Sequence, residues 1–448
     1  MSSRSGMSAG RSDWTKPLRN AGRLAAGRGV QAVCSIAYLA IAARVLGPEN
    51  FGALVLIHSL ALAIAQFSTF GSMEMLVRFG SLALADGRDH QRLHRLIRYG
   101  HLLDGLGILI AWTGMILAAQ WALNRFEMPP GMHRLTLVYW FAAVLIMNLS
   151  QTYNGALRLL DRFKLLAYQS TVEPVLRLLG AVLMMRLEAG LFGFLAAWFV
   201  ALLAGRVTLI LTARWALRRE NLPAAGPTTF REIANPERGI WRFVLWLQWT
   251  TTAGLATTQL PLLAIGGMLN NSAAGLYKLA QQITALLERA NSKLLVPSLY
   301  TELSRLSASR EHAQRRHMVL KITGWLAVVG AGLFVLLVLL GKPLLLLVAG
   351  EEFIGAYPVM LWLAAAGVIG SLSVTLEPLL MAAGRMRTIA LAGTLPLLVF
   401  VPLLFALIER VGLVGVGMAA TVYAVLYTSL LVLAVRRMFA REATAQPA

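Results

Sequence analysis

The chain has 448 residues, of which 57% are hydrophobic and 14% are charged, and its mean hydropathy is +0.65. Soluble domains carry about 25% charged residues, so this composition excludes an ordinary water-soluble fold. The formal net charge of +20 is compatible with a nucleic-acid-binding protein or a membrane protein, and the positions of the basic residues decide between the two.

Long apolar segments recur from one end of the chain to the other. The first, residues 24–46, would be roughly 34 Å long as a helix, which is enough to cross a bilayer. It is full length and ends at Arg44 without a small-residue cleavage site, so we expect an uncleaved span and not a signal peptide. Twelve spans are predicted in all: 24–46, 51–77, 99–123, 135–157, 168–185, 190–213, 243–264, 273–296, 322–340, 356–383, 388–408 and 412–435.

Basic residues cluster on one side of this predicted topology. With the N-terminus in the cytoplasm, the cytoplasmic segments hold 30 of the 41 Lys and Arg residues and the outer loops hold five. Such a bias follows the positive-inside rule and predicts that both termini are cytoplasmic. Membrane topology therefore explains most of the basicity, and we expect no nucleic acid partner.

An internal repeat appears at an offset of 222–223 residues. "FGALVLI" from Phe51 pairs with "AGLYKLA" from Ala274, "RDH" with "REH", "DRFKLLA" with "GRMRTIA", and "GLFG" with "GLVG". Each half then has six spans, an even number, which predicts parallel repeats about an axis along the membrane normal, as in many secondary transporters. We predict a six-helix bundle over residues 1–216, a cytoplasmic linker over 217–242 and a second six-helix bundle over 243–448.

Polar side chains at helical spacing predict a hydrophilic cavity between the halves. The eighth span carries Lys278, Gln281, Gln282, Glu288 and Arg289 on one stripe. Further polar candidates are Gln248 and Gln259 in the seventh span, Gln66 in the second, and Arg44 and Arg78 near span ends. The cations favour an anionic ligand. The alternative is structural: polar contacts between helices, snorkelling of Arg44 and Arg78, or local pairing with Glu74 and Glu288.

Four further titratable residues inside predicted spans are candidates for ion coupling: Asp104, Glu173, Glu377 and His58. Glu173 lies one turn before Arg177, which favours a structural ion pair. Glu377 has no nearby cation in sequence and precedes a proline, which frees a backbone carbonyl for a cation or proton site. His58 is either a hydrogen-bonded structural group or a proton sensor.

Signatures of catalysis and of cofactor binding are absent from the sequence. "GKP" at 341–343 lacks the first glycine and the hydroxyl residue of a phosphate-binding loop, and there is no HExxH motif or paired-cysteine metal site. We therefore expect neither an enzyme nor a bound cofactor or metal. Coupling to protons or sodium is left open.

Several stretches resemble one family along the whole chain. "ARVLGPENFGAL", "FGSMEMLVRFGS", "AAGLYKLAQQITALLE", "GKPLLLLVAGEEFIGAYPVMLWL" and "MAAGRMRT" are similar to bacterial polysaccharide biosynthesis membrane proteins. These are the flippases of lipid-linked O-antigen and exopolysaccharide repeat units, within the multidrug/oligosaccharidyl-lipid/polysaccharide exporter superfamily. The matching motifs mostly mark helix ends.

The resemblance implies a V-shaped pair of six-helix bundles in the bacterial inner membrane, working by alternating access. Its expected substrate is an undecaprenyl-pyrophosphate-linked oligosaccharide for polysaccharide or lipopolysaccharide synthesis, with the pyrophosphate on Lys278 and Arg289. Membrane lipids are expected partners, and glycosyltransferases and a polysaccharide polymerase are candidate ones. The alternatives are a drug/cation antiporter of the same superfamily, a peptidoglycan-precursor flippase with fourteen spans, and a non-transporting scaffold for glycan assembly.

Overall fold

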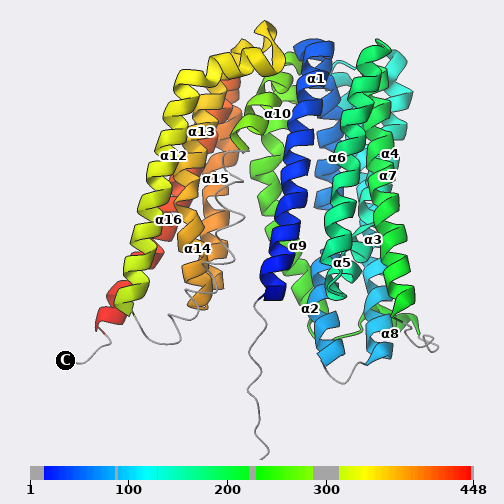
Figure 1. Ribbon diagram of the computed structural model, residues 1–448, viewed down its shortest axis with the longest axis vertical. Coiled ribbons are helices and arrows are strands. Elements are labelled where there is room, and N and C mark those ends of the chain that lie inside the picture. The colour runs from blue at the N-terminus through cyan, green and yellow to red at the C-terminus, as the bar shows by residue number, and fades with distance from the viewer. Residues whose placement is uncertain (1–14, 86–88, 129, 221–228, 286–311, 445–448) are drawn as a thin grey trace, which may run out of the picture.

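A computed structural model describes residues 15–85, 89–128, 130–220, 229–285 and 312–444 (Figure 1). Every regular element within these ranges is a helix, which confirms the predicted all-α class. Eight stretches of the described residues are long and apolar enough to cross a membrane. The count of twelve spans stays a prediction.

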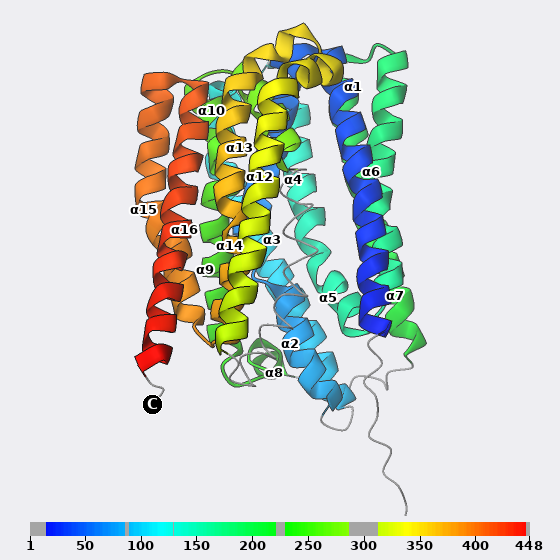
Figure 2. The same cartoon turned by 60° about the vertical axis from the view of Figure 1, so that its left-hand side comes forward.

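The helices form two groups (Figures 1 and 2). The first contains α1 (Thr15–Phe67), α2 (Ser72–Ala85), α3 (His90–Arg125), η1 (Pro130–Met132), α4 (His133–Leu149), α5 (Gln151–Leu159), α6 (Phe163–Arg186) and α7 (Gly190–Arg219). The second contains α12 (His312–Ala349), η2 (Glu351–Ala356), α13 (Tyr357–Ser371), α14 (Ser373–Ala382), α15 (Met386–Val411) and α16 (Leu413–Thr444). α8 (Phe230–Ala234) packs against α3 of the first group, and α9 (Ile240–Thr258), α10 (Leu260–Met268) and the helical residues 271–285 lie between the groups.

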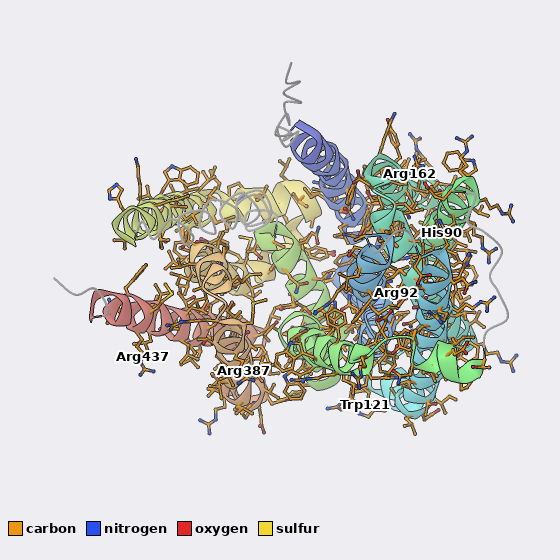
Figure 3. All side chains as sticks on the ribbon, turned by 90° about the horizontal axis from the view of Figure 1, so that it is seen from below. His90, Arg92, Trp121, Arg162, Arg387 and Arg437 are labelled. Carbon is orange, nitrogen blue, oxygen red and sulfur yellow. The ribbon has the colours of Figure 1, made fainter. Side chains whose placement is uncertain are left out.

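The two groups meet at the upper end of Figure 1 and diverge toward the lower end. The end of α2, the start of α3, the α5–α6 and α14–α15 turns and the end of α16 all lie at the lower end. Figure 3 views this end and labels arginines from both groups, including Arg92, Arg162, Arg387 and Arg437. These turns belong to the segments that the charge bias assigns to the cytoplasm.

Several predicted spans are interrupted, which corrects their description as continuous helices. The predicted span 51–77 is split between Phe67 and Ser72, and the span 135–157 is split at Ser150. Hydroxyl groups compete with the helical hydrogen bonds at both breaks: Ser68 Oγ donates to the Ala65 carbonyl and Ser150 Oγ to the Met147 carbonyl. The spans 243–264 and 356–383 are likewise split, at Gln259 and Leu372.

Backbone turns recur at the offset of the predicted repeat. Asp161 and Gly384 are both left-handed, with φ of 55° and 71°, and each precedes an arginine that caps the next helix with nearly the same dihedral angles. The helix break at Ser150 lies 222 residues before the break at Leu372. These correspondences support two halves built on one plan.

The upper ends of the two halves cross at two glycines, Gly52 and Gly275, which are related by the offset of the predicted repeat. A Cβ atom on Gly52 would lie 1.7 Å from the Asn271 carbonyl oxygen, and one on Gly275 would lie 2.4 Å from the Pro48 carbonyl oxygen. Only glycine allows backbones to approach this closely. Each half therefore places the first turn of its second helix against the other half's equivalent turn.

Candidate substrate site

A buried polar network lies at the centre of the N-terminal group. Arg177 on α6 is 7% exposed and forms a 2.7 Å ion pair with Glu173, as the sequence spacing predicts. Its guanidinium also donates to Tyr38 Oη on α1 at 3.3 Å and to His58 Nε2 at 3.3 Å. His58 Nδ1 lies 2.7 Å from Tyr139 Oη on α4. The network therefore joins three helices around one buried cation.

The tautomer of His58 follows from these partners. A guanidinium has donors only, so His58 Nε2 accepts from Arg177. The ring is then neutral with its proton on Nδ1, which donates to Tyr139 Oη. Aromatic rings enclose the group, with the Arg177 guanidinium carbon 4.9 Å from the Trp198 ring centroid and the His58 ring 5.3 Å from the same ring. His58 is hydrogen-bonded at both ring nitrogens, and its role as a structural group or a proton sensor stays a prediction.

A polar cavity of about 350 Å³ opens beside this network. Its walls come from α1, α5, α6 and α7, and we call it the N-half cavity; its charged and amide lining residues are Gln31, Asn154, Arg158, Gln169, Glu173, Arg177 and Arg206. Arg158 and Arg206 belong to no substrate site that the sequence predicts. Sequence analysis missed them because Arg158 resembles a basic residue of a cytoplasmic turn and Arg206 is isolated in an apolar span.

Lys278 lies on the helical residues 271–285, close to the start of the second half. It is half-buried, and its ammonium donates to Gln281 Oε1 at 3.1 Å. Gln282 on the next turn is also half-buried. Arg289, predicted as the second anion-binding residue, lies outside the described residues.

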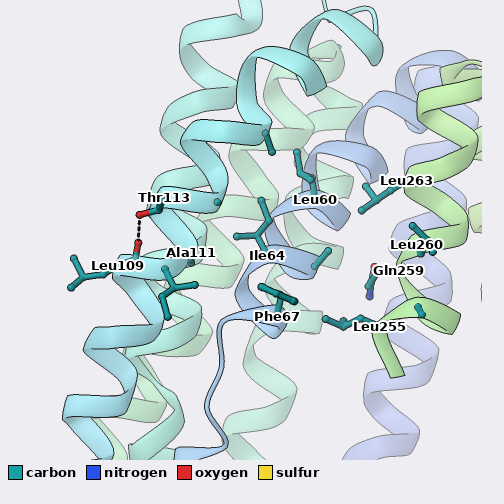
Figure 4. A pocket seen from close by; sticks show the side chains of 15 residues that line it. Leu60, Ile64, Phe67, Leu109, Ala111, Thr113, Leu255, Gln259, Leu260 and Leu263 are labelled. Atoms are coloured by element: carbon teal, nitrogen blue, oxygen red, sulfur yellow. Dashed lines mark hydrogen bonds between the residues drawn. The ribbon is translucent and has the colours of Figure 1, made fainter. Parts of the chain in front are cut away.

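The three remaining glutamine candidates lie in the middle of α9, in the last turn of α1 and at the α9–α10 break. Gln248 on α9 donates to the Phe67 carbonyl, where α1 ends, and to Thr252 Oγ1 at 3.3 Å. Gln66 is half-buried in the last turn of α1. Gln259, at the α9–α10 break, lines a separate groove of about 720 Å³ whose walls are mostly aliphatic side chains of α1, α3, α9 and α10 (Figure 4). Neither Gln248 nor Gln259 lines the N-half cavity.

Arg44 and Arg78 have partners at the two ends of the molecule. Arg44 donates to the carbonyls of Leu346, Leu347 and Val348 in the last turn of α12, so it caps a helix of the other half. Arg78 is exposed and lies over the Phe243 ring of α9, 4.7 Å from its centroid. Both contacts join the halves, and neither arginine lines the N-half cavity.

Asp104 and Glu377, two candidates for ion coupling, have hydrogen-bond partners of different kinds. Asp104 is 4% exposed, accepts from Ser72 Oγ at 2.6 Å and from the Thr152 backbone N–H at 3.1 Å, and so caps α2 and α5 at their breaks. Glu377 on α14 accepts from Tyr427 Oη on α16 at 2.5 Å. Among the described residues, Glu377 has no ion-pair partner.

This arrangement defines the class of the protein as a multi-pass membrane protein built of two helix groups that meet at one end. The profile of the polysaccharide biosynthesis protein family matches residues 18–296, and the chain belongs to that family. It is 30% identical to the inner membrane protein YghQ of Escherichia coli K12 over 352 residues, which cover 76% of this chain and 94% of that protein.

Solved structures share the fold at low sequence identity. An inward-facing multidrug resistance MATE family transporter of the MOP superfamily matches with a TM-score of 0.73 at 14% identity, over 93% of this chain and 96% of that one. The inward closed form of the lipid II flippase MurJ matches with a TM-score of 0.69 at 12% identity, over 94% and 90% of the two chains. The chain therefore shares the fold of these two solved structures.

Proposed function

We propose that the protein moves undecaprenyl-pyrophosphate-linked oligosaccharide repeat units across the bacterial inner membrane by alternating access, for O-antigen or exopolysaccharide synthesis. The observation that carries the proposal is that cationic side chains lie within the membrane-spanning helices. The N-terminal group contains Arg177 and Arg206 within its helices, and Lys278 lies on the helical residues 271–285. Family membership and the likeness to a lipid II flippase support a lipid-linked substrate.

The chemistry of such a substrate fits two kinds of surface. Guanidinium and ammonium groups bind phosphate oxygens by charge-assisted hydrogen bonds. The prenyl chain needs no polar partner and suits an apolar groove like the one between α1, α3, α9 and α10. The basic lower end of the molecule would face the cytoplasm, where lipid-linked repeat units are assembled.

The proposal is tested by complementation and by reconstitution. A strain lacking the gene is expected to lose the surface glycan and to regain it with the wild-type gene, but only in part with Lys278→Ala or Arg289→Ala. Proteoliposomes holding a fluorescent lipid-linked oligosaccharide should show protein-dependent transfer between leaflets. Normal glycan from both variants would contradict the assigned anion site, and exchange of cationic drugs without lipid transfer would favour the antiporter.

A further inference from the structure

We propose that the N-half cavity is a binding site for a phosphate-class oxyanion, separate from the site assigned to Lys278 and Arg289. Three guanidinium groups line it, from Arg158 on α5, Arg177 on α6 and Arg206 on α7, against the single carboxylate of Glu173. The cavity therefore has an excess of two positive charges. A phosphate group carries about −1.5 to −2 at neutral pH, which matches that excess.

The partners of these arginines show which of them remain available to a ligand. Arg177 uses its terminal nitrogens on Glu173, Tyr38 and His58, and its Nε has no hydrogen-bond partner among the described residues. Arg158 donates through Nε to Asn154 Oδ1 at 3.0 Å, and this leaves both of its terminal nitrogens for a ligand at an exposed position. Arg206 is half-buried, and its Nε has no hydrogen-bond partner among the described residues.

An unpartnered guanidinium N–H inside a membrane protein calls for an acceptor. Buried donors are satisfied in most native structures by protein, water or ligand. The pairing of Glu173 with Arg177 shows that the cavity already accommodates one carboxylate. A second anion between Arg158 and Arg206 would meet donors on two different helices, α5 and α7, and a phosphate has enough acceptor oxygens to bond to both.

The size and the remaining lining residues indicate what the oxyanion carries. A volume of about 350 Å³ is within the range of small-molecule sites and exceeds what a bare phosphate needs. The amide side chains of Gln31 and Asn154 and the hydroxyl of Ser35 add donors and acceptors. Hydroxyl-rich groups such as sugars bind to side chains of this kind. We therefore assign a phosphate or diphosphate bearing a polyhydroxylated group.

The position of the cavity gives the site a direction of access. Its lining runs along α6 from Leu166, near the lower turn, to Arg177 in the middle of the helix. The ligand would therefore enter from the basic lower end and reach the network of Arg177 and His58. Binding of a free anion does not rest on the proposed function, whereas binding of a lipid-linked diphosphate does.

The test measures binding of inorganic pyrophosphate to the full-length protein in lipid nanodiscs by isothermal titration calorimetry. Arg206→Gln and Arg158→Gln should each weaken binding by about tenfold to a hundredfold, the value of one charge-assisted hydrogen bond. Arg206→Lys keeps the positive charge but loses the forked pair of guanidinium donors. Its affinity for pyrophosphate should lie between those of Arg206→Gln and wild type. Arg186→Gln is the matched control, because Arg186 is an exposed arginine in the last turn of α6.

The outcomes separate this site from the proposed function. Binding that is equal in wild type, Arg206→Gln and Arg158→Gln would overturn the inference, as would an equal loss in Arg186→Gln. Because Arg158 is exposed at the cavity, its variant should fold even if Arg206→Gln does not.

A second experiment uses undecaprenyl pyrophosphate and glucose 1-phosphate as competitors of pyrophosphate binding. Displacement by the lipid identifies the membrane source, and displacement by the sugar phosphate alone identifies a soluble one; either supports the site. Lys278→Ala should retain pyrophosphate binding even where export fails.

Discussion

Asp104 is a buried carboxylate with two donors and no cation beside it among the described residues. Its partners, Ser72 and the Thr152 N–H, begin the two helix segments that follow the breaks in the N-terminal group. We therefore interpret Asp104 as the group that holds these breaks together. Its sequence neighbours contain no sign of this role, because both partners lie more than thirty residues away.

Removing the Asp104 carboxylate should destabilise the N-terminal group. Asp104→Ala leaves the Ser72 hydroxyl and the Thr152 N–H without an acceptor, at a cost of about 1–3 kcal/mol for each stranded group. Asp104→Asn keeps one acceptor oxygen and should cost less. Thermal unfolding in detergent is measured with Glu409→Ala, a change at an exposed residue, as the control. The unfolding midpoint should be highest for Glu409→Ala, lower for Asp104→Asn and lowest for Asp104→Ala. Wild-type stability in both variants, together with lost transport, would indicate an ion-coupling role instead.

Arg44 should stabilise the contact between the halves at the upper end. Its guanidinium binds three carbonyls of α12, yet the side chain is exposed, so we expect a contribution of only about 1–2 kcal/mol, or a factor of about 5–30 in population. Spin labels at positions 50 and 351, in a Cys34→Ser background, should report longer distances in Arg44→Ala.

The control for this measurement is Arg134→Ala. Arg134 is an exposed arginine in the first turn of α4, so its removal changes the same charge without touching α12. Distances that lengthen equally in both variants would show a general charge effect. Unchanged distances in Arg44→Ala would show that the glycine crossing alone holds the upper end closed.

At the level of helices, Gly52 and Gly275 determine how closely the halves can approach. Alanine at either position places a Cβ within 2.4 Å or less of a carbonyl oxygen of the other half, and backbone cannot move aside as a side chain can. We expect Gly52→Ala and Gly275→Ala to lengthen the same label distance. Gly324→Ala on α12, where a Cβ meets nothing within 4 Å, is the matched control and should leave the distance unchanged.

Sequence patterns predict the helices and their turns better than their breaks. The turn at Gly47, where φ is 69° and the next helix begins at Pro48, has the local signals of glycine and proline. The breaks at Ser150 and Leu372 contain neither residue, and after the Ser150 break the Thr152 N–H finds its acceptor on another helix, at Asp104. Residues 24–46 and 51–77 were expected as separate spans; the non-helical dihedral angles of Gly47 separate the first helix from the second, and the second span is divided again between Phe67 and Ser72.

The candidate site was predictable only where its parts share one helix. The ion pair between Glu173 and Arg177 follows from their spacing of four residues. The contacts of Arg177 with Tyr38 and His58 span 139 and 119 residues, and no periodicity of a single helix indicates them. Arg206 was missed for the same reason, since its position beside Glu173 and Arg177 is known only once α6 and α7 are packed.

For the whole molecule, the contacts at the upper end and the divergence at the lower end would be one state of the alternating-access cycle that we propose (Figure 1). The TM-score against the inward-facing MATE family structure is 0.73, compared with 0.64 against the outward-facing one. Opening the upper end requires Arg44 to release α12 and the glycine pair to separate. A substrate can favour that change only by binding more tightly to the outward-facing state.

The membrane potential is an energy source for the proposed transport. A lipid-linked pyrophosphate carries about two negative charges, and moving them outward across about 100 mV, negative inside, would release roughly 4–5 kcal/mol at about 2.3 kcal/mol per charge. Transfer of the labelled lipid in proteoliposomes should therefore accelerate when a potassium gradient with valinomycin makes the interior of the proteoliposomes negative, if the protein has its basic end inside. The acceleration should disappear when the gradient is removed and reverse its sign for protein inserted the other way. A rate that responds to a pH gradient but not to the potential would instead require an exchanged proton, and Glu377 with its Tyr427 partner would be the first carboxylate to substitute.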